Sequence, residues 1–447
     1  MKNEHVENAG EEMYVLLRQL YPICRSITGD GVRKTLNILR DHIPLEIREV
    51  PTGTRVLDWT IPKEWNIEDA YIKDPNGKKI VDFKKSNLHV MSYSCPVSGI
   101  IPLQELKKHL HTLENYPDWI PYLTTYYNER WGFCMSHHDA EKLIDGDYEV
   151  KIESGFRDGS LTYGEYYLKG ESEEEVLFST YLCHPSLCND NLSGVVLLAH
   201  LAKFLTGIKL KYSYRFLFIP ETIGAITWLY QNEKHLPNIR FGLVATCVGD
   251  PGISTYKKSR GSVNTIDKIV QKVLEDSGDP FKIIDFFPSG SDERQFCSPG
   301  FNMPVGSLMR TPYAQFPEYH TSADNLNFVT AKHLADSFRK YTEVIYTIEN
   351  DNRYLNTNPK GEPQLGRRGL YQTIGGKKDA GMAEAAIQWT LNQSDGVHSL
   401  LDIAIQSKIP FRAIRDAADS LEECGLLVPA KTLQFIPPDP SSAGFPA

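Results

Sequence analysis

The chain has 447 residues, 41% of them hydrophobic, and a formal net charge of -9 at pH 7. This length exceeds what one hydrophobic core usually supports, which indicates two or three domains, and the modest negative charge argues against a general nucleic-acid binder. The N-terminal segment is polar and acidic, and no apolar run is long enough to span a bilayer. We therefore expect a cytoplasmic protein without a membrane partner, whose cysteines, lacking any CxxC pair, are free thiols.

The first third of the chain changes character at about residue 53. After this point Asn76-Gly77 gives a hairpin signal between two short strand-like pieces, and an aromatic-rich stretch follows at 116–133. We predict that residues 53–150 form a small β-rich domain inserted into a larger one. Before this point the pattern predicts two helices and a strand, at 11–21, 31–42 and 45–50.

From residue 148 onward, strand-like segments rich in β-branched and aromatic residues alternate with helix-like segments. This alternation predicts an α/β fold with a mixed, mainly parallel sheet flanked by helices. Residues 1–52 and 151–355 together are expected to form this domain. The expected strands lie at 148–152, 161–168, 176–182, 212–219 and 241–248, and the expected helices at 193–205, 225–232, 267–276 and 330–349.

Residues 356–363 have the composition of a linker, and residues 366–447 are expected to form a winged-helix domain. Winged helices usually bind DNA, but basic and acidic residues are equal in number between 366 and 436, whereas phosphate neutralisation needs an excess of cations. We therefore expect a protein-interaction or packing role rather than DNA binding. The expected helices lie at 380–392, 399–407 and 411–424, and the expected strands at 426–428 and 433–436.

The stretch from His184 to Gly194 carries the strongest chemical signal. His184 and Asp190 lie between an apolar strand-like segment, 176–182, and an apolar helix-like segment, 194–202. Polar residues at such a junction indicate the C-terminal edge of an α/β sheet, where these folds place their sites. Because histidine and aspartate are both ligands of hydrolytic zinc ions, the stretch predicts part of a zinc site.

Three further polar clusters follow along the chain. Glu221 comes directly after an apolar strand, Asp292-Glu293-Arg294 occupies a Gly/Ser loop, and His320 lies near the end of the α/β domain. A lone histidine or strand-end glutamate is more often structural than functional. Four clusters at successive loop positions can, however, meet at one edge of the sheet, and this pattern predicts a metal-dependent hydrolase.

Five motifs also carry a resemblance to known proteins. The run from about 148 to 325 resembles the zinc-dependent aminopeptidase fold of co-catalytic metallo-exopeptidases. The whole chain is similar to a bacterial family described as having an aminopeptidase-like domain, with a small inserted domain and a C-terminal winged helix, and often named in connection with polysaccharide biosynthesis. The motifs are Gly53-Thr-Arg-Val-Leu-Asp-Trp-Thr-Ile-Pro62, Tyr181-Leu-Cys-His-Pro-Ser-Leu187, Pro220-Glu-Thr-Ile-Gly224, Gly290-Ser-Asp-Glu-Arg294 and Glu318-Tyr-His-Thr-Ser-Ala-Asp324.

The resemblance implies a role for each matching residue. His184, Asp190 and His320 match metal ligands, with Asp190 in the place of the carboxylate that bridges two zinc ions, and Glu221 matches the general base. These roles imply a hydrolase in which metal-activated water attacks an amide carbonyl, acting on a peptide or on a small amide-containing substrate.

The chain departs from the aminopeptidase pattern at several ligand positions. Ser186 stands where the aminopeptidases have an aspartate, and Thr222 where they have a second glutamate. Cys247 or Asp250 could supply a later ligand. The number of zinc ions, one or two, therefore stays open. One zinc held by His184, Asp190 and His320 with an open fourth position fits the remaining ligands.

The loop with Asp292, Glu293 and Arg294 is expected to bind substrate. One of the carboxylates could bind a free ammonium group, and the guanidinium could bind a carboxylate or an oxyanion. The alternative is a salt-bridged loop without substrate contact. Tyr319 is expected to line the pocket, although a packed aromatic ring would explain it equally well.

Two other functions stay open alongside the hydrolase. The first is a catalytically degenerate, peptidase-like protein that binds a peptide or glycan precursor and uses the winged helix as an interaction module. Ser186 and Thr222 favour this reading. The second is a DNA-binding regulator that senses a ligand through its α/β domain. Self-association into a homo-oligomer also stays open.

Overall fold

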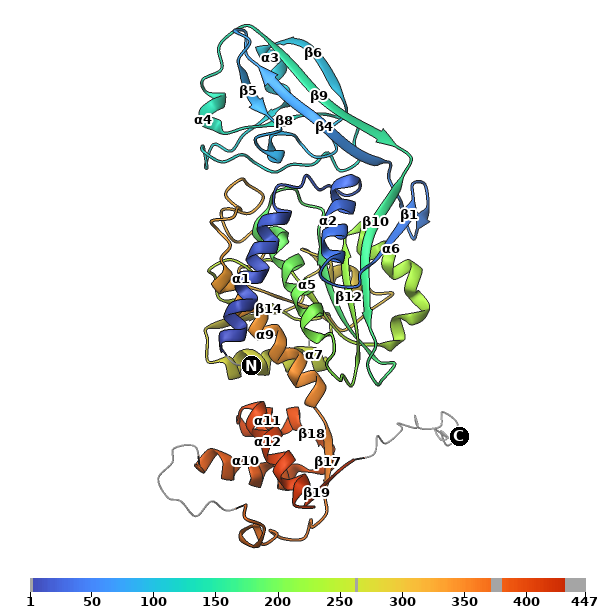
Figure 1. The fold of residues 1–447 in the computed structure, drawn as a ribbon, viewed down its shortest axis with the longest axis vertical. Helices are drawn as coiled ribbons and strands as arrows, with labels where there is room; N and C mark the ends of the chain where they lie inside the picture. Colours follow the sequence, from blue (N-terminus) through green and yellow to red (C-terminus); the bar gives the residue numbers. More distant parts are fainter. Residues whose placement is uncertain (1–2, 262–263, 371–379, 431–447) are drawn as a thin grey trace, which may run out of the picture. The chain divides into compact units, whose positions relative to one another are not determined.

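The computed structural model describes residues 3–261, 264–370 and 380–430. The chain divides into two compact units, Met1–Val344 and Ile345–Ala447 (Figure 1). The first unit contains a large mixed sheet with its helices and a smaller β-rich insert, and the second contains the C-terminal helices and strands.

The large sheet has eight strands in the order β1-β10-β12-β11-β13-β16-β14-β15. The four central strands, β12, β11, β13 and β16, are parallel neighbours, while β1, β10 and β14 each pair antiparallel with a neighbour. The strands are β1 Glu46–Pro51, β10 Ser160–Leu168, β11 Glu175–Tyr181, β12 Ser213–Ile219, β13 Ile239–Ala245, β14 Ser254–Lys257, β15 Phe281–Ile284 and β16 Val305–Met309.

Both faces of this sheet are covered, which explains why β11 is buried along its whole length. Successive residues of β11 face opposite sides. Leu177 belongs to a core cluster with Trp228 of helix α6, whereas the ring of Phe178 lies 6.0 Å from that of Tyr341 of helix α9. The helices of this region are α1 Asn3–Leu20, α2 Asp30–Arg40, α5 Ser193–Leu205, α6 Ile223–Asn232, α7 Thr265–Ser277, α8 Glu293–Phe296 and α9 Ala331–Asn350, with the 3-10 turn η4 Glu233–Asn238.

The insert is built on a four-stranded antiparallel sheet in the order β5-β4-β9-β6 (Figure 1). The strand expected at 148–152 belongs here, because β9 pairs with β4 and β6 rather than with the large sheet. An alternating pattern predicts a strand but does not specify its partners. The insert contains β2 Arg55–Val56, β3 Trp59–Thr60, β4 Glu64–Lys73, β5 Lys79–Asp82, η1 Asn87–His89, β6 Val97–Pro102, α3 Leu103–Leu106, η2 Lys107–His109, β7 Leu110–His111, β8 Phe133–Cys134, α4 His137–Ala140 and β9 Asp147–Arg157.

A buried carboxylate joins the insert to the large sheet. Glu64 of β4, with a side chain 1% exposed, accepts hydrogen bonds from Arg33 of α2 at 2.6 Å and 2.9 Å. It also accepts from Arg157 at 2.6 Å and from the backbone N–H of Ser160 at 3.2 Å. The side chain of Glu64 thus contacts both the start of α2 and the turn that leads from β9 to β10.

The C-terminal unit has the arrangement of a winged helix. Three helices pack beside an antiparallel sheet in the order β18-β17-β19. Strand β17 lies before residue 366, where the sequence predicted that the domain starts. The prediction missed this strand because a short sequence next to a linker-like stretch gives little periodicity to detect. The elements are β17 Arg353–Asn356, η5 Leu365–Arg368, α10 Ala380–Gln393, β18 Asp395–Ser399, α11 Leu400–Ser407, α12 Phe411–Glu423 and β19 Leu427–Pro429.

Two further expectations from the sequence concern a C-terminal strand and the absence of membrane-spanning segments. The strand expected at 433–436 lies outside the described residues. Among the helices that the structure does describe, none has both the length and the apolar composition needed to cross a membrane.

Candidate active site

The polar clusters predicted from the sequence meet at the C-terminal edge of the parallel strands. His184 follows β11, Glu221 follows β12, and Cys247 follows β13. The segment that carries His320 follows β16. Between β11 and α5 lies the short segment η3 Cys188–Leu192, which carries Asp190 in a non-helical backbone conformation. The large sheet therefore brings together side chains that are far apart in the sequence, as expected for this edge of an α/β sheet.

His184, Asp190 and His320 form the only group of metal-ligating side chains that converges within the described residues. Each offers one ligand atom, and these atoms all lie within 4.8 Å of one another. Nδ1 of His184, Oδ2 of Asp190 and Nε2 of His320 are buried without a hydrogen-bond partner. Oδ2 of Asp190 and Nε2 of His320 are 2.9 Å apart, which is ion-pair distance when the imidazole is protonated. Buried ligand atoms that converge in this way without hydrogen-bond partners have the arrangement of a cation site.

Asp190 is held through its carboxylate and through its backbone. The Tyr181 hydroxyl donates a hydrogen bond to Oδ1 and also lies 2.8 Å from Oγ1 of Thr246. The backbone N–H groups of Asn189 and Asp190 donate to Asp324, at 2.6 Å and 2.9 Å. Burial by itself would raise the pKa of Asp190, but His184 and His320 lower it to about 2. Oδ1 thus accepts the hydrogen bond of Tyr181, and Oδ2 is the oxygen available to a ligand.

The two histidines are positioned mainly through backbone and ring contacts. Nε of Arg25 donates to the carbonyl of His184 at 3.0 Å. The ring of Tyr319 stacks on His320, with centroids 4.0 Å apart and an interplanar angle of 11°. Burial lowers the pKa of His184 to about 4, although Asp190 opposes this shift. A neutral imidazole is the form that binds a metal.

Tyr122 of the insert also reaches this site. Its ring centroid lies 5.2 Å from that of His184 and 5.1 Å from that of His320, edge-on in both cases. Its backbone N–H donates to the carbonyl of His320 at 2.8 Å. No motif in the sequence distinguishes Tyr122 from the other aromatic residues of 116–133, so sequence analysis missed it. Arg25 was missed in the same way, whereas Asp324 ends one of the quoted motifs but was given no role.

Glu221 lies beside the group of three. Its Oε2 is 3.9 Å from Nε2 of His184, and its backbone N–H donates to Sγ of Cys183 at 3.3 Å. Burial, reinforced by the carboxylates of Asp292 and Asp190, raises the pKa of Glu221 well above its ordinary value. A carboxylate in this environment is poised to take up a proton.

Asp292 and Arg294 both contact Thr222, the residue after Glu221. Oδ1 of Asp292 accepts from the Thr222 backbone N–H at 2.7 Å, and Nη2 of Arg294 donates to Oγ1 of Thr222 at 3.1 Å. Oδ2 of Asp292 and Nε of Arg294 have no hydrogen-bond partner among the described residues. Burial raises the pKa of Asp292 to about 7, against the effect of the Thr222 N–H.

Glu293 has a different environment. Its Oε1 lies 2.7 Å from Nζ of Lys257, and both side chains are fully buried. The Tyr313 hydroxyl is 3.2 Å from the same oxygen. Glu293 is therefore paired inside the protein with Lys257, while its Oε2 has no partner among the described residues.

Three side chains at or near positions where aminopeptidases carry metal ligands already form hydrogen bonds within the protein. The Ser186 hydroxyl donates to the carbonyl of Tyr21 at 3.0 Å. Asp250 accepts from Nδ2 of Asn189 at 3.0 Å and from Oγ1 of Thr311 at 2.6 Å. Cys247 is buried and accepts from Oγ1 of Thr246 at 3.4 Å. None of these side chains belongs to the converging group within the described part of the chain.

Backbone strain is concentrated around the site. Ser186, Thr222, Cys247 and His320 have φ values of 45°, 65°, 50° and 55°, in the left-handed region. Non-glycine residues in this region cost free energy and persist where the surrounding structure enforces them, often at functional sites.

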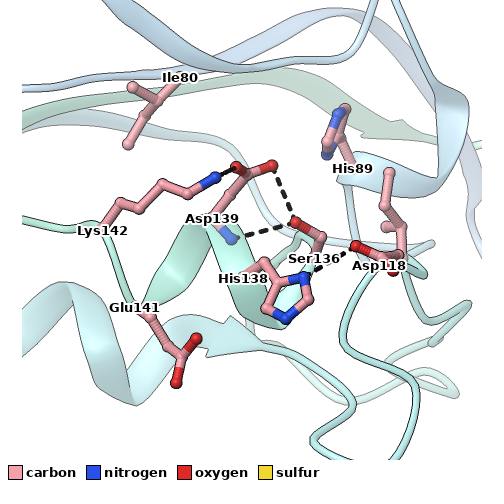
Figure 2. A pocket seen from close by; sticks show the side chains of 9 residues that line it. Ile80, His89, Asp118, Ser136, His138, Asp139, Glu141 and Lys142 are labelled. Carbon is pink, nitrogen blue, oxygen red and sulfur yellow. Dashed lines mark hydrogen bonds and ion pairs between the residues drawn. The ribbon is translucent and has the colours of Figure 1, made fainter.

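The insert also holds a separate surface pocket of about 610 Å³ (Figure 2). Several of its polar groups are paired with one another. His138 lies 2.8 Å from Asp118, and Asp139 is bonded to Ser136 and Lys142, each at 2.8 Å. This pocket does not include any member of the converging group, so it is distinct from the candidate active site.

Comparison with protein families decides the classification. A family described as "Domain of unknown function (DUF4910)" matches residues 14–351. The chain belongs to this DUF4910 family. A second family, described as winged helix-turn-helix, matches residues 352–429, so the C-terminal domain expected from the sequence is confirmed as a winged helix.

A close relative of this DUF4910 chain carries the name that the resemblance suggested. A protein of Clostridium acetobutylicum is 59% identical over 428 residues, which cover 95% of this chain and 98% of the relative. Its name assigns it to polysaccharide biosynthesis with an aminopeptidase-like domain. A crystal structure of a candidate peptidase from Clostridium acetobutylicum has a TM-score of 0.92 and 57% identity, and covers 96% of this chain and 98% of that one.

More distant solved structures share the fold. The zinc aminopeptidase of Bacillus subtilis has a TM-score of 0.56 at 13% identity, covering 76% of this chain and 95% of that one. The M28 peptidase precursor of Shewanella amazonensis has a TM-score of 0.53 at 13% identity, covering 78% and 98%. The predicted aminopeptidase-like α/β fold is therefore confirmed.

Proposed function

We propose that this protein is a zinc-dependent hydrolase that cleaves an amide bond, with Glu221 as the general base. The observation that carries this proposal is the convergence of His184, Asp190 and His320 beside the Glu221 carboxylate. Their ligand atoms lie within 4.8 Å of one another, and each side chain keeps a buried polar atom without a hydrogen-bond partner. The aminopeptidase-like fold supports the reaction class, because the site occupies the edge where such folds place their chemistry.

The donor set fits zinc. Two imidazoles and one carboxylate leave a fourth position open, as in catalytic zinc sites. A zinc ion held there would supply Lewis-acid activation of water and of the substrate carbonyl. The three side chains are already oriented by contacts with their neighbours, which is the condition for tight and specific binding.

We infer a stoichiometry of one ion per chain. The resemblance gives Asp190 the place of a carboxylate shared by two ions, but here Oδ1 already accepts the hydrogen bond of Tyr181, and Oδ2 is the oxygen without a hydrogen bond. Thr222 and Ser186, which stand in place of two aminopeptidase ligands, have hydroxyl groups engaged with Arg294 and with the carbonyl of Tyr21. These contacts favour a mononuclear site.

Glu221 would move the proton in the reaction. Its carboxylate accepts a proton from the attacking water and passes it to the departing amide nitrogen, so that the base is regenerated. Asp292 and Arg294 adjoin Glu221 through Thr222, and each keeps one unpartnered polar atom. They are the side chains proposed to bind substrate, with Tyr319 on the His320 side. Glu293 would act through Lys257 rather than by direct contact.

The substrate is proposed to be a small amide. A peptide with a free N-terminus fits the aminopeptidase-like fold. An N-acylated amino sugar fits the polysaccharide link in the name of the Clostridium acetobutylicum relative. Both substrates need the same activated water, so both belong in the first assay panel.

The proposal is tested by metal analysis followed by turnover. The purified protein is analysed by elemental mass spectrometry before any metal is added, and is then assayed on aminoacyl and N-acyl substrates. About one zinc per chain and turnover that disappears in Glu221→Gln would support the proposal. A protein that takes up no zinc on titration, or a Glu221→Gln variant with full turnover, would contradict it.

A second candidate is a binding protein without turnover. Thr222 and Ser186 favour it, because their hydroxyl groups are fixed inside the protein where aminopeptidases carry carboxylate ligands. Binding of a peptide or glycan fragment by the zinc-loaded protein, with no turnover of any member of the panel, would favour this reading.

The winged helix is proposed to be an interaction module rather than a DNA-binding domain. The two arginines of α12 contact groups within the compact unit Ile345–Ala447. Arg415 bonds Asp419 and the Tyr354 hydroxyl, and Arg412 lies over the Tyr346 ring at 3.8 Å.

A further inference from the structure

We propose that Tyr122 is a positioning residue that the insert contributes to the zinc site, so that zinc binding and docking of the insert are linked. This inference rests on the proposed function, because it treats His184 and His320 as zinc ligands. It goes beyond that function by assigning part of the site to a domain that contains none of the ligands.

Residues 120–122 of the insert are docked on residues 320–322 of the main domain by their backbones. The Tyr122 N–H donates to the His320 carbonyl, and the Ser322 N–H donates to the Ile120 carbonyl, both at 2.8 Å. The Ile120 N–H donates to Oγ of Ser322 at 2.9 Å. An isolated antiparallel bridge joins Pro121 to Thr321. The loop that carries His320 is therefore held by the insert.

The Tyr122 ring then contacts both proposed ligands. Its plane is inclined by 73° to the His184 ring and by 86° to the His320 ring, with centroids 5.2 Å and 5.1 Å away. Leu88 and Leu187 form a small apolar cluster with it, and the residue is 9% exposed. The ring is thus fixed from the insert and from the main domain at once.

These ring contacts take the place of a more usual arrangement. Histidines that bind metals generally donate their second ring N–H to a carboxylate or carbonyl, which fixes the ring orientation. In the described residues no group makes such a hydrogen bond to a ring nitrogen of His184, and its nearest carboxylate oxygen, on Glu221, is 3.9 Å away. The rings of Tyr122 and Tyr181, at 5.2 Å and 5.3 Å, orient it instead.

Linkage follows from this geometry. Zinc binds more tightly when Tyr122 holds the two imidazoles in place. Because binding free energies are reciprocal, zinc then stabilises the docked state of residues 120–122 by the same amount. The amide protons of Tyr122 and Ser322 lie in the docking contact and report on it directly.

The test is a zinc titration against a chromophoric chelator, with the full chain as wild type, Tyr122→Ala, Tyr122→Phe and Tyr116→Ala. We expect Tyr122→Ala to weaken zinc binding by about 10–100-fold, as for other residues that orient metal ligands, and Tyr122→Phe, which keeps the ring, to restore it to within about threefold. Tyr116→Ala is the matched control, because Tyr116 lies on the same segment but stacks on Trp119 instead.

Hydrogen exchange of the wild-type protein is the second measurement and does not depend on a variant folding. Zinc is expected to slow exchange of the Tyr122 and Ser322 amides. Unchanged zinc affinity in Tyr122→Ala, or unchanged exchange of these amides on adding zinc, would overturn the proposal while leaving the proposed function standing. A wild-type protein that binds no zinc would overturn both the Tyr122 proposal and the proposed function. The titration of the wild type separates this outcome from a failure of the Tyr122 proposal alone.

Discussion

The hydroxyl of Tyr181 donates a hydrogen bond to Oδ1 of Asp190, inside the main domain. The two oxygens of this carboxylate therefore have different roles. Oδ1 is satisfied by the protein, and Oδ2, 2.9 Å from Nε2 of His320, is available to a ligand. A neutral donor that holds one oxygen also leaves the negative charge of Asp190 in place for the ion.

Tyr181→Phe is expected to lower the free energy of unfolding by about 1.5–3 kcal/mol, because the charged Oδ1 would stay buried without a donor. Urea unfolding at neutral pH measures this effect. Tyr163→Phe is the control, because Tyr163 is also buried but bonds the neutral amide of Gln231. Its loss is expected to cost about 0.5–1.5 kcal/mol. Equal losses in the two variants would argue against a charged partner for Tyr181.

Glu221→Gln is expected to lower kcat by about 10²–10⁴-fold while retaining zinc, because glutamine cannot accept the proton and Glu221 is not among the converging ligands. Steady-state kinetics on the best substrate and elemental analysis of the same sample measure the two effects. Glu233→Gln, an exposed position beyond α6, should leave both unchanged. Loss of zinc in Glu221→Gln would mean that Glu221 is a ligand instead.

Glu64→Gln is expected to destabilise the protein in a pH-dependent manner. Hydrogen bonds from Arg33, opposed by burial and supported by Arg157, lower the pKa of Glu64 from 4.5 to about 2. The stabilisation is therefore fully present above about pH 4.5 and is lost as the pH falls through 2. We expect a difference of about 2 kcal/mol at pH 7, less than the full shift implies because Arg157 is exposed to solvent.

Denaturant unfolding of the wild type and Glu64→Gln at several pH values checks this prediction. Glu149→Gln is a suitable comparison, because Glu149 pairs with Lys73 at the surface, where solvent screens the pair and its contribution to stability is small. A difference between wild type and Glu64→Gln that persists unchanged down to pH 2 would show that the charge of Glu64 is not its source.

The winged helix is expected to show no salt-sensitive DNA binding. In α12 the guanidinium of Arg415 is already bonded to Asp419 and Tyr354, and the exposed residues Asp416 and Glu423 would repel phosphates. Filter binding with duplex DNA at about 50 mM and about 200 mM salt measures this, because phosphate contacts weaken steeply over that range. Retention that falls with salt would contradict the expected interaction role.

The sequence allowed the strand-end residues of the site to be predicted, but not the residues that hold them in position. His184, Asp190, Glu221 and His320 follow apolar segments, and the topology of a parallel sheet brings such positions together. Tyr122 is one aromatic residue among many in 116–133, and nothing in its surroundings indicates a contact with a residue about 200 positions later. Contacts of this kind depend on how the insert docks, which local patterns do not encode.

The same limit explains the strands that were placed incorrectly or missed. The alternation at 148–152 indicates a strand, yet β9 pairs inside the insert because its partners β4 and β6 supply the matching apolar face. Strand β17 is too short for its own periodicity to be detected, and it forms because β18 and β19 lie on either side of it. In both cases the partner strands decide the outcome.

The register of β1 and β10 determines how the insert is connected to the large sheet. Pro51, the last residue of β1, is paired with Ser160, the first residue of β10. Residues 52–159 therefore leave and rejoin the large sheet at one point, as the enlarged tip of a single β-hairpin. The strand order of the large sheet is therefore independent of the length of the segment between Pro51 and Ser160, so this segment can be shortened or exchanged without reordering any strand of the sheet.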